Sequence, residues 1–278
     1  MFLITGDSRS PARFRESAIR NPNSAMRRRF YAPPESFAHD GARVVLSSEE
    51  SRHLRDVLRL RAGDEASVFD GEGREFACAV SETGVRGRAA LEVRGRVEPQ
   101  RPESPLDLTL AVALLKGEKF DMVVQKATEL GAWRVAPVLT KRADVRPRDE
   151  RDTARRVERW RRLALEASKQ SGRARVPSVA GPVAFDSFAA VASRAGELRA
   201  LFAERGCVSL DSFSVDGESG PEVVTALVGP EGGWDDEEIE LARSRGWAII
   251  TLGGRTLRAE TAAVVIMALL QHLYGDLR

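Results

Sequence analysis

Apolar and polar positions change their period near residue 105, and this change divides the chain into two parts. Between residues 27 and 97 the apolar residues form short runs separated by glycine-containing turns, a pattern typical of strands. We expect strands at residues 44–46, 65–69, 75–80 and 89–96, and a short helix at 49–58 capped by a serine at 47 or 48. Residues 26–98 are therefore interpreted as a small β-rich domain in the form of a barrel.

From residue 106 onward, apolar strands alternate with amphipathic helices, which predicts an α/β domain with a mostly parallel sheet over residues 106–278. Pro99, Pro102 and Pro105 in a polar stretch predict a linker at 99–105. The expected strands are residues 106–115, 133–139, 198–203, 224–228 and 248–252, and the expected helices are 119–130, 152–171, 235–245 and 261–274. The last helix is strongly apolar and roughly 21 Å long at 1.5 Å per residue, so it suits a core or a subunit interface and is too short to span a membrane.

The first 25 residues show no sustained periodicity and contain Pro11, Asn21 and Pro22, which predicts a disordered extension at residues 1–25. The composition changes at Met26, which is a candidate for the true translation start. No apolar run approaches the roughly 20 residues that cross a bilayer, and the N-terminus lacks the apolar stretch of a secretory signal. We therefore expect a cytoplasmic protein with no membrane partner, whose two cysteines, Cys78 and Cys207, are reduced.

The net charge and the number of metal-ligating residues exclude some classes of function. The chain has 278 residues with 43 Lys and Arg against 41 Asp and Glu, so its net charge of +2 does not indicate a nucleic-acid binder. Only three histidines and no CxxC pair are present, and we expect no metal site. The charge is segregated, however, with a net +7 at residues 141–176 and a net −10 at 177–240. Blocks of one sign often mark interaction surfaces, although a solvated helix face is the simpler explanation for any single block.

Two glycine-rich turns follow apolar strands and precede helices. The first is VGPEGGW at residues 228–234, and the second is LGGRTLRAETA at residues 252–262. Both lie at the carboxyl ends of consecutive strands, where open α/β sheets bind ligands, and glycine lets backbone amides approach a ligand closely. Neither turn is a GxGxxG fingerprint, a phosphate loop or a GxSxG elbow. A generic turn explains either one alone, but the pair, with Arg258 and Glu260 beside the second, predicts a ligand cavity.

These motifs resemble those of the SPOUT methyltransferases and, among them, the RsmE family, the 16S rRNA uridine-N3 methyltransferases. The resemblance runs in order over about residues 26–278. It is carried by RRF at 28–30, HL at 53–54, VLR at 57–59, KGEK at 116–119, QKATELG at 125–131, EA at 166–167, QSGR at 170–173, GPEGG at 229–233 and LRAETA at 257–262. Residues 1–25 have no counterpart, and Lys169 and Trp234 are departures that do not touch the chemistry.

The resemblance implies an α/β protein with an N-terminal PUA-like β-barrel that helps to hold RNA and a C-terminal SPOUT domain with a deep trefoil knot. It also implies a homodimer, S-adenosyl-L-methionine as cofactor, and 16S rRNA in the small ribosomal subunit as substrate. The cofactor would be held by residues of the two turns: Val228, Gly229, Pro230, Glu231, Gly232, Gly233, Leu252, Gly253, Leu257, Arg258 and Thr261.

The implied reaction moves a methyl group to uracil N3, whose proton must leave while negative charge develops on the uracil carbonyls. Arg258 is the candidate for stabilising that charge, and Glu260 is the candidate for accepting the proton. A structural arginine and a carboxylate favoured by a helix N-terminus are the alternatives for these two residues. Candidates for phosphate contacts, each of which could instead be an ordinary solvated residue, are Arg27, Arg28, Arg29, Arg52, Arg59, Lys116, Lys119, Lys141, Arg142 and Arg173.

Two other functions compete with methyl transfer. One is a non-catalytic RNA-binding or ribosome-assembly protein that retains the fold, although such a protein would have little need of both glycine turns. The other is a nucleotide-dependent oxidoreductase, which the missing dinucleotide fingerprint disfavours.

Overall fold

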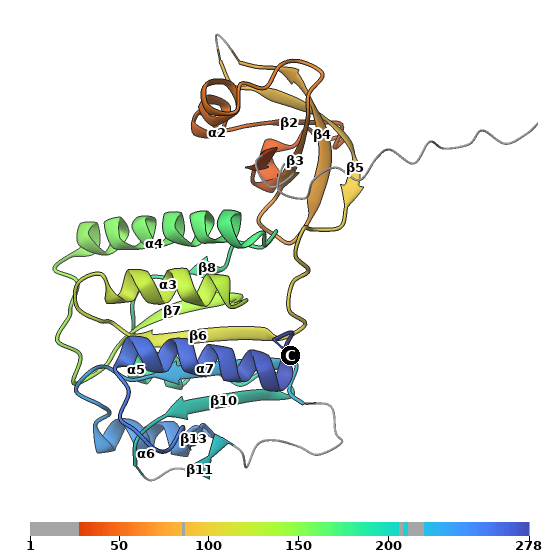
Figure 1. Cartoon of the computed structure of the whole chain (residues 1–278). Coiled ribbons are helices and arrows are strands. Elements are labelled where there is room, and N and C mark those ends of the chain that lie inside the picture. The colour runs from red at the N-terminus through yellow and green to blue at the C-terminus, as the bar shows by residue number, and fades with distance from the viewer. Residues whose placement is uncertain (1–27, 85–86, 206–207, 211–219, 278) are drawn as a thin grey trace, which may run out of the picture.

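The computed structural model of the chain describes residues 28–84, 87–205, 208–210 and 220–277, in two bodies joined by an extended segment (Figure 1). The extension expected at residues 1–25, the candidate start Met26, Arg27 and Cys207 lie outside the described residues. The boundaries expected at 26–98, 99–105 and 106–278 stay predictions.

The first body is a five-stranded sheet in the order β1-β3-β4-β5-β2. Its strands are β1 (Arg29–Tyr31), β2 (Arg43–Val45), β3 (Glu65–Phe69), β4 (Glu75–Glu82) and β5 (Ala90–Val97). All the pairings are antiparallel except that of β1 with β3. Four of these strands were expected, whereas β1 has only three residues and is too short to show an alternation of apolar and polar positions.

Short helical elements close this sheet. A 3₁₀ turn covers Pro34–Ser36, and helix α2 (Ser48–Arg52) runs directly into a π-helical turn at His53–Val57. Ser47 caps α2 by accepting a hydrogen bond of 3.1 Å from the backbone N–H of Glu50. The expected helix at 49–58 is thus present in two parts, and its Leu54 is buried together with Phe30, Val44 and Leu91.

The second body is an eight-stranded sheet in the order β11-β13-β10-β12-β6-β7-β8, with β9 also paired to β7. The strands are β6 (Asp107–Ala113), β7 (Arg134–Leu139), β8 (Ser178–Val179), β9 (Val183–Ala184), β10 (Glu197–Phe202), β11 (Val208–Ser209), β12 (Val223–Val228) and β13 (Ala248–Thr251). Every pairing is parallel, as the alternation of strands and helices predicts.

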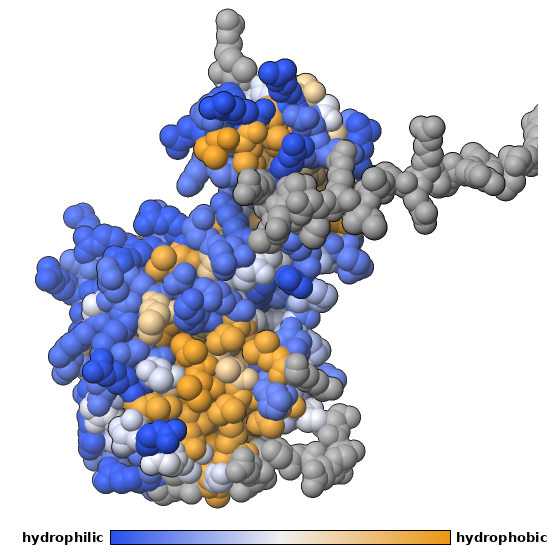
Figure 2. Space-filling view, in the orientation of Figure 1, coloured by the Kyte–Doolittle hydropathy of each residue, from blue (hydrophilic) through white to orange (hydrophobic). Residues whose placement is uncertain are grey.

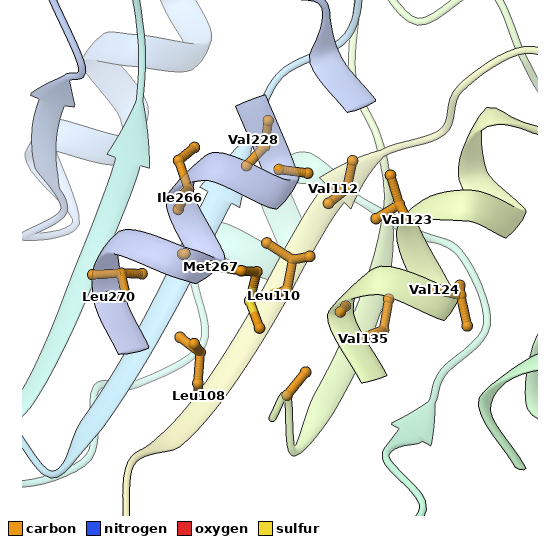
Figure 3. Close-up of a cluster of buried hydrophobic side chains, with 14 of the residues drawn as sticks. Leu108, Leu110, Val112, Val123, Val124, Val135, Val228, Ile266, Met267 and Leu270 are labelled. Atoms are coloured by element: carbon orange, nitrogen blue, oxygen red, sulfur yellow. The ribbon is translucent and has the colours of Figure 1, made fainter. Parts of the chain in front are cut away.

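Helices cover both faces of this sheet because its strands are apolar on both sides. Helices α3 (Lys119–Glu129), α4 (Glu150–Ser171) and α7 (Ala259–Tyr274) share one hydrophobic core with the sheet, and α5 (Phe185–Ala189) and α6 (Asp236–Ser244) share the other. On β6, Leu108 and Leu110 face α7, where they meet Met267 and Leu270 (Figure 3), whereas Ala111 belongs to the opposite core. This period of two fixes which helix lies on which face.

Residues 173–176, directly after α4, form the junction between the two bodies. The Gly73 N–H donates to the Ala174 carbonyl at 3.1 Å, and the Val176 N–H donates to the Gly71 carbonyl at 2.9 Å. The barrel turn at 71–73 is therefore bonded through its backbone to the α/β domain, in addition to the covalent linker. Lys169 of α4 adds an ion pair to Glu50 of α2.

Two arginines that we expected to contact RNA phosphates are instead buried in this junction. Arg173 is 5% exposed, forms an ion pair of 2.7 Å with Glu103, and donates to the carbonyls of Thr128 and Ala132. Arg29 is 8% exposed and donates to Glu75 and to the Arg173 carbonyl. Because both guanidinium groups are buried and bond protein oxygens, we no longer assign a phosphate contact to either residue.

Three further observations concern the described residues. None of their helices is long and apolar enough to cross a bilayer. No group of three or more His, Cys, Asp or Glu side chains among them could hold a metal ion. Cys78 is a buried free thiol whose pKa is raised to about 12 by burial. The trefoil knot implied by the resemblance stays a prediction.

Replacing Arg173 with Met should lower the free energy of unfolding by about 3 kcal/mol, because the carbonyls of Thr128 and Ala132 lose a buried donor and Glu103 loses its ion-pair partner. The measurement is chemical denaturation followed by tryptophan fluorescence. Arg43→Met is the control, since Arg43 forms an exposed pair with Glu82 and its loss should cost less than about 1 kcal/mol. Equal effects of the two substitutions would contradict a role for Arg173 in the junction.

Candidate active site

The two glycine turns line a single cavity of about 650 Å³ at the carboxyl end of the parallel sheet. The expectation that they converge is therefore confirmed. Ten of the eleven residues assigned to the cofactor line this cavity, and Thr261, which is exposed on α7, does not. Its walls combine the apolar side chains of Val228, Leu252, Leu257 and Ile266 with the backbone of both turns.

The strands that carry the two turns are consecutive in sequence but are not neighbours in the sheet. Strand β10 lies between them, paired with β12 on one side and β13 on the other. Phe202, the last residue of β10, and residues 203–205 after it therefore line the cavity, and so does Arg142 from the segment after β7. The sequence analysis missed both contributions because neither segment contains a glycine motif or any other local signal.

Trp234 joins the first turn to the end of β10. Its indole Nε1–H donates to the Phe202 carbonyl at 2.8 Å, and the side chain is buried. A Cβ atom at Gly229 would lie 2.9 Å from that nitrogen, closer than real Cβ contacts. Glycine is thus required at 229 because the indole passes directly against the backbone. Trp234, a departure from the family pattern, has a structural role, and a capping box of Asp235 and Glu238 begins α6 directly after it.

Arg258 lies at the cavity, at the N-cap of α7. The residue is exposed, and its guanidinium has no hydrogen-bond or ion-pair partner among the described residues. A structural arginine would bond the loop carbonyls, and none of the described ones accepts from it. Its charge and its fixed set of donors are therefore available to a bound molecule.

Glu260 has a different environment from Arg258. It is 8% exposed, in the first turn of α7, and does not line the cavity. Its Oε1 lies 3.6 Å from the Lys119 Nζ, and its Oε2 has no hydrogen-bond partner. Because Oε2 is buried and lies outside the cavity, the position fits a carboxylate favoured by the helix N-terminus, and the role of proton acceptor stays a hypothesis.

Lys119, which we expected to contact RNA, links the two turns. Its Nζ lies 2.9 Å from Glu231 Oε1 in the first turn, in addition to its contact with Glu260 in the second motif. The hydrogen bond to Glu231 is the main reason that the pKa of Lys119 is raised. Burial opposes ionisation of Glu231, but the hydrogen bond from Lys119 and other favourable contacts outweigh it, so the pKa of Glu231 is lowered. Both groups are charged at neutral pH.

Three other basic residues from the sequence analysis lie around the first turn and are paired with acids. Lys116 pairs with Asp144 at 2.6 Å, Arg142 pairs with Asp235 at 3.3 Å, and Lys141 pairs with Asp235 at 3.2 Å and also with Glu237. All three are exposed and come from segments far from the turn in sequence. Arg28, Arg52 and Arg59 are exposed on the barrel.

Substituting Gly229 with Ala should weaken binding of S-adenosylmethionine about tenfold, because the added methyl group forces Trp234 away from the turn and overpacking costs about 1–3 kcal/mol. Isothermal titration measures the effect. Gly181→Ala is the matched control, since nothing lies within 4 Å of a Cβ atom at 181. Unchanged affinity in the Gly229 variant would mean that the indole does not shape the binding site.

Comparisons with known proteins agree with this architecture. Residues 102–271 match the RNA methyltransferase domain family, and residues 46–86 match the RNA methyltransferase PUA domain family. Ribosomal RNA small subunit methyltransferase E of Synechocystis is 34% identical over 89% of this chain and 78% of its own length. The Bacillus subtilis protein of the same name is 27% identical over 90% of this chain and 100% of its own length.

Solved structures are similar to this chain over most of its length. The Legionella pneumophila putative methyltransferase Lpg2936, in complex with the bound cofactor SAM, has a TM-score of 0.76 and 32% identity, covering 90% of this chain and 98% of its own. A ribosomal RNA small subunit methyltransferase E from Neisseria gonorrhoeae bound to S-adenosyl methionine has a TM-score of 0.76 and 31% identity, covering 90% of this chain and 99% of its own. This chain has a PUA-like barrel, an α/β methyltransferase domain and relatives that match most of its length. These three findings show that it belongs to the ribosomal RNA small subunit methyltransferase E family, RsmE.

Proposed function

We propose that this chain, an S-adenosylmethionine-dependent methyltransferase of small-subunit ribosomal RNA, methylates N3 of a specific uridine in 16S rRNA. The observation that supports the proposal best is the cavity built from both family motifs, with the unpaired Arg258 at its edge. As part of this function, we also propose that the protein is cytoplasmic and acts as a homodimer.

The cavity has the properties that S-adenosylmethionine requires. Its volume of about 650 Å³ falls within the usual range for small-molecule sites, about 300–1,000 Å³. Val228, Leu252, Leu257 and Ile266 would hold the adenosine part by apolar contact, and the amides of the two turns would hold the polar groups. When bound, the cofactor supplies a methyl group on a positively charged sulfur. Binding through backbone groups explains why both turns are rich in glycine.

Arg258 is proposed to stabilise the negative charge that develops on the uracil carbonyls as the N3 proton leaves. A guanidinium stays charged at any physiological pH and presents donors in a fixed plane, so it needs little reorganisation during the reaction. Its lack of a protein partner means that no existing hydrogen bond must break before it meets the substrate. Catalysis by such fixed charges is often the largest single contribution to rate.

Glu260 is proposed to accept the N3 proton, directly or through a water molecule. Its unpaired Oε2 supplies the acceptor, and Lys119 holds the other oxygen. Because Lys119 also bonds Glu231, it fixes this carboxylate relative to the wall of the cofactor cavity. Lys119 is therefore a positioning residue in this proposal, and we no longer assign it primarily to RNA.

RNA binding is proposed for Arg28, Arg52 and Arg59 of the barrel and for Lys116, Lys141 and Arg142 beside the cavity. The second group is paired with acids, but all six residues are exposed, and exposed pairs are weak enough to exchange a carboxylate for a phosphate. Arg27 belongs to the same proposal and lies outside the described residues. The target uracil would have to leave its stack to reach the methyl group.

The proposed homodimer would cover α7. The outward side of this helix presents Val264, Val265 and Ala268, and Figure 2 shows a hydrophobic area over α7. Apolar patches of this kind mark interaction surfaces on soluble proteins. A second copy placed on α7 would lie near the cofactor cavity, since Ala262 and Ile266 of the same helix line it.

Mass spectrometry of 16S rRNA from cells that lack the gene tests the substrate. We expect one N3-methyluridine to disappear and to return on complementation. Persistence of every methylated uridine would refute the proposed base. Isothermal titration with S-adenosylmethionine separates the enzyme from a non-catalytic RNA-binding protein, and NAD serves as the control for an oxidoreductase.

Arg258→Ala should lower kcat by about 100-fold or more while changing the affinity for S-adenosylmethionine much less, because the charge acts mainly in the transition state. Single-turnover assays and titration give the two quantities. A parallel loss of both would mean that Arg258 builds the cavity instead.

Lys119→Met should reduce kcat about tenfold or more, whereas Lys119→Arg should retain most of it, because an arginine can still bridge Glu231 and Glu260. The role of Lys119 is decided by whether the substitution changes kcat or the KM for S-adenosylmethionine. If the Met variant changes KM alone, Lys119 only braces the first turn and does not act through Glu260.

Val265→Lys should convert a dimer into a monomer, because it places a charge on the outward side of α7. Size-exclusion chromatography with light scattering measures the mass. A wild-type protein that is monomeric at micromolar concentration would exclude the dimer.

A further inference from the structure

A second cavity, of about 490 Å³, lies where the barrel meets the methyltransferase domain. Tyr31, Pro34 and the turn at 70–72 line it from the barrel, and residues 161, 162, 165 and 176–179 line it from the other domain. We call it the interdomain groove. Figure 1 shows α4 as the helix nearest to the barrel, and Figure 2 shows a largely hydrophilic surface over α4. None of the groove residues has a role in the cofactor cavity.

Tyr31 is an aromatic surface fixed in the groove. Its ring packs against Phe69 at a centroid distance of 5.4 Å. It also lies directly over Gly71, where a Cβ atom would come within 2.9 Å of the ring and within 3.5 Å of Val176. Phe69 and the backbone of Gly71 therefore hold the ring in place from the barrel, with Val176 of the other domain against the same turn, while the ring remains partly exposed. A ring held in this way loses little entropy when a base stacks on it, and stacking on aromatic side chains is how single-stranded RNA is commonly bound.

The α4 side of the groove supplies positive charge. Arg161 donates to the Val179 carbonyl at 3.2 Å, which holds it against the wall. Arg162 is exposed and has no hydrogen-bond or ion-pair partner among the described residues, so its charge is not neutralised by the protein. An unpaired guanidinium beside a fixed aromatic ring matches a nucleotide, which has a phosphate and a base.

Among the described residues that line the groove, the acidic groups are Asp70 and Glu72, both of the barrel. Asp70 bonds the backbone of its own turn and pairs with Arg74, and Glu72 pairs with Arg74 at 3.0 Å. This arrangement separates the groove into a barrel side, where a phosphate would be repelled, and an α4 side, where it would be attracted. The base of a bound nucleotide would accordingly lie toward the barrel and its phosphate toward α4.

Helix α4 also connects the groove with the active site. Arg159 lies three residues before Arg162, on the same side of α4, and about 4.5 Å along the helix axis at 1.5 Å per residue. Its guanidinium pairs with Asp121 of α3 and lies 3.9 Å from Glu118, the residue next to Lys119. An RNA strand that follows α4 from the groove therefore reaches the N-terminus of α3, where Lys119 contacts Glu260.

We propose that the interdomain groove binds a single-stranded nucleotide of the RNA substrate near the target uridine, with its base stacked on Tyr31 and its phosphate held by Arg162. The proposal rests on the proposed function, because it takes RNA as the substrate, and it adds a binding subsite outside the cofactor cavity. It predicts that RNA binding uses both domains at once, which requires the rigid junction at residues 173–176.

The test uses the full-length protein with two substitutions and their controls. Tyr31→Leu should raise the Kd for a ten-nucleotide single-stranded RNA about tenfold, and Tyr31→Phe should keep wild-type affinity, because the stacking surface remains. Arg162→Gln should weaken binding and reduce the slope of log K against log salt by about 0.7, the value for one phosphate contact on a single strand. Arg245→Gln removes an exposed arginine far from the groove and should change neither quantity.

Methylation of small ribosomal subunits provides the second readout. Both groove variants should lower kcat/KM for subunits about tenfold, with an unchanged Kd for S-adenosylmethionine. Wild-type values for Arg162→Gln and Tyr31→Leu in both assays would overturn the proposal. Because Arg162 is exposed, its variant stays informative if Tyr31→Leu fails to fold. A wild-type protein that methylates no ribosomal RNA would instead refute the proposed function, so the two failures are distinguishable.

Discussion

Parallel pairing of β10 between β12 and β13 is the constraint on which the cofactor cavity depends. Because the three strands run in one direction, the segments that follow them meet at one edge of the sheet. The hydrogen bond from Trp234 to the Phe202 carbonyl then fixes the first glycine turn to the end of the middle strand. Without β10 in that position the two turns would be neighbours with no room between them, and the cavity would lose one wall.

The junction at residues 173–176 fixes the position of the barrel relative to the α/β domain. A linker alone would leave the two domains free to move, since interfaces between domains are often small and polar. Here the backbone bonds to the turn at 71–73 and the hydrogen bond from Arg29, which is buried and paired with Glu75, to the Arg173 carbonyl hold them in one arrangement. A buried ion pair of this kind adds little net stability but is strongly destabilising when broken, so it specifies geometry more than it stabilises the fold.

Charge pairing distinguishes basic residues that are bonded to an acid from those whose charge is not neutralised by the protein. The lysines and Arg142 around the first turn are each paired with an acid, whereas Arg258 and Arg162 have no such partner among the described residues. Unpaired guanidinium groups therefore lie at the cofactor cavity and in the interdomain groove. This distribution explains how a chain with a net charge of only +2 can present positive charge at specific points.

The sequence by itself determined the long strands and helices, the two-part organisation and the two glycine turns, because hydrophobic period and turn residues are local properties of the chain. Membership of the RsmE family was likewise readable from motifs in order along the chain. Only the tertiary structure decided that β10 separates the two turns, that Lys119 bonds Glu231 and Glu260, and that Arg29 and Arg173 are buried. Strand order and ion-pair partners join residues that are far apart in sequence, so no local pattern encodes them.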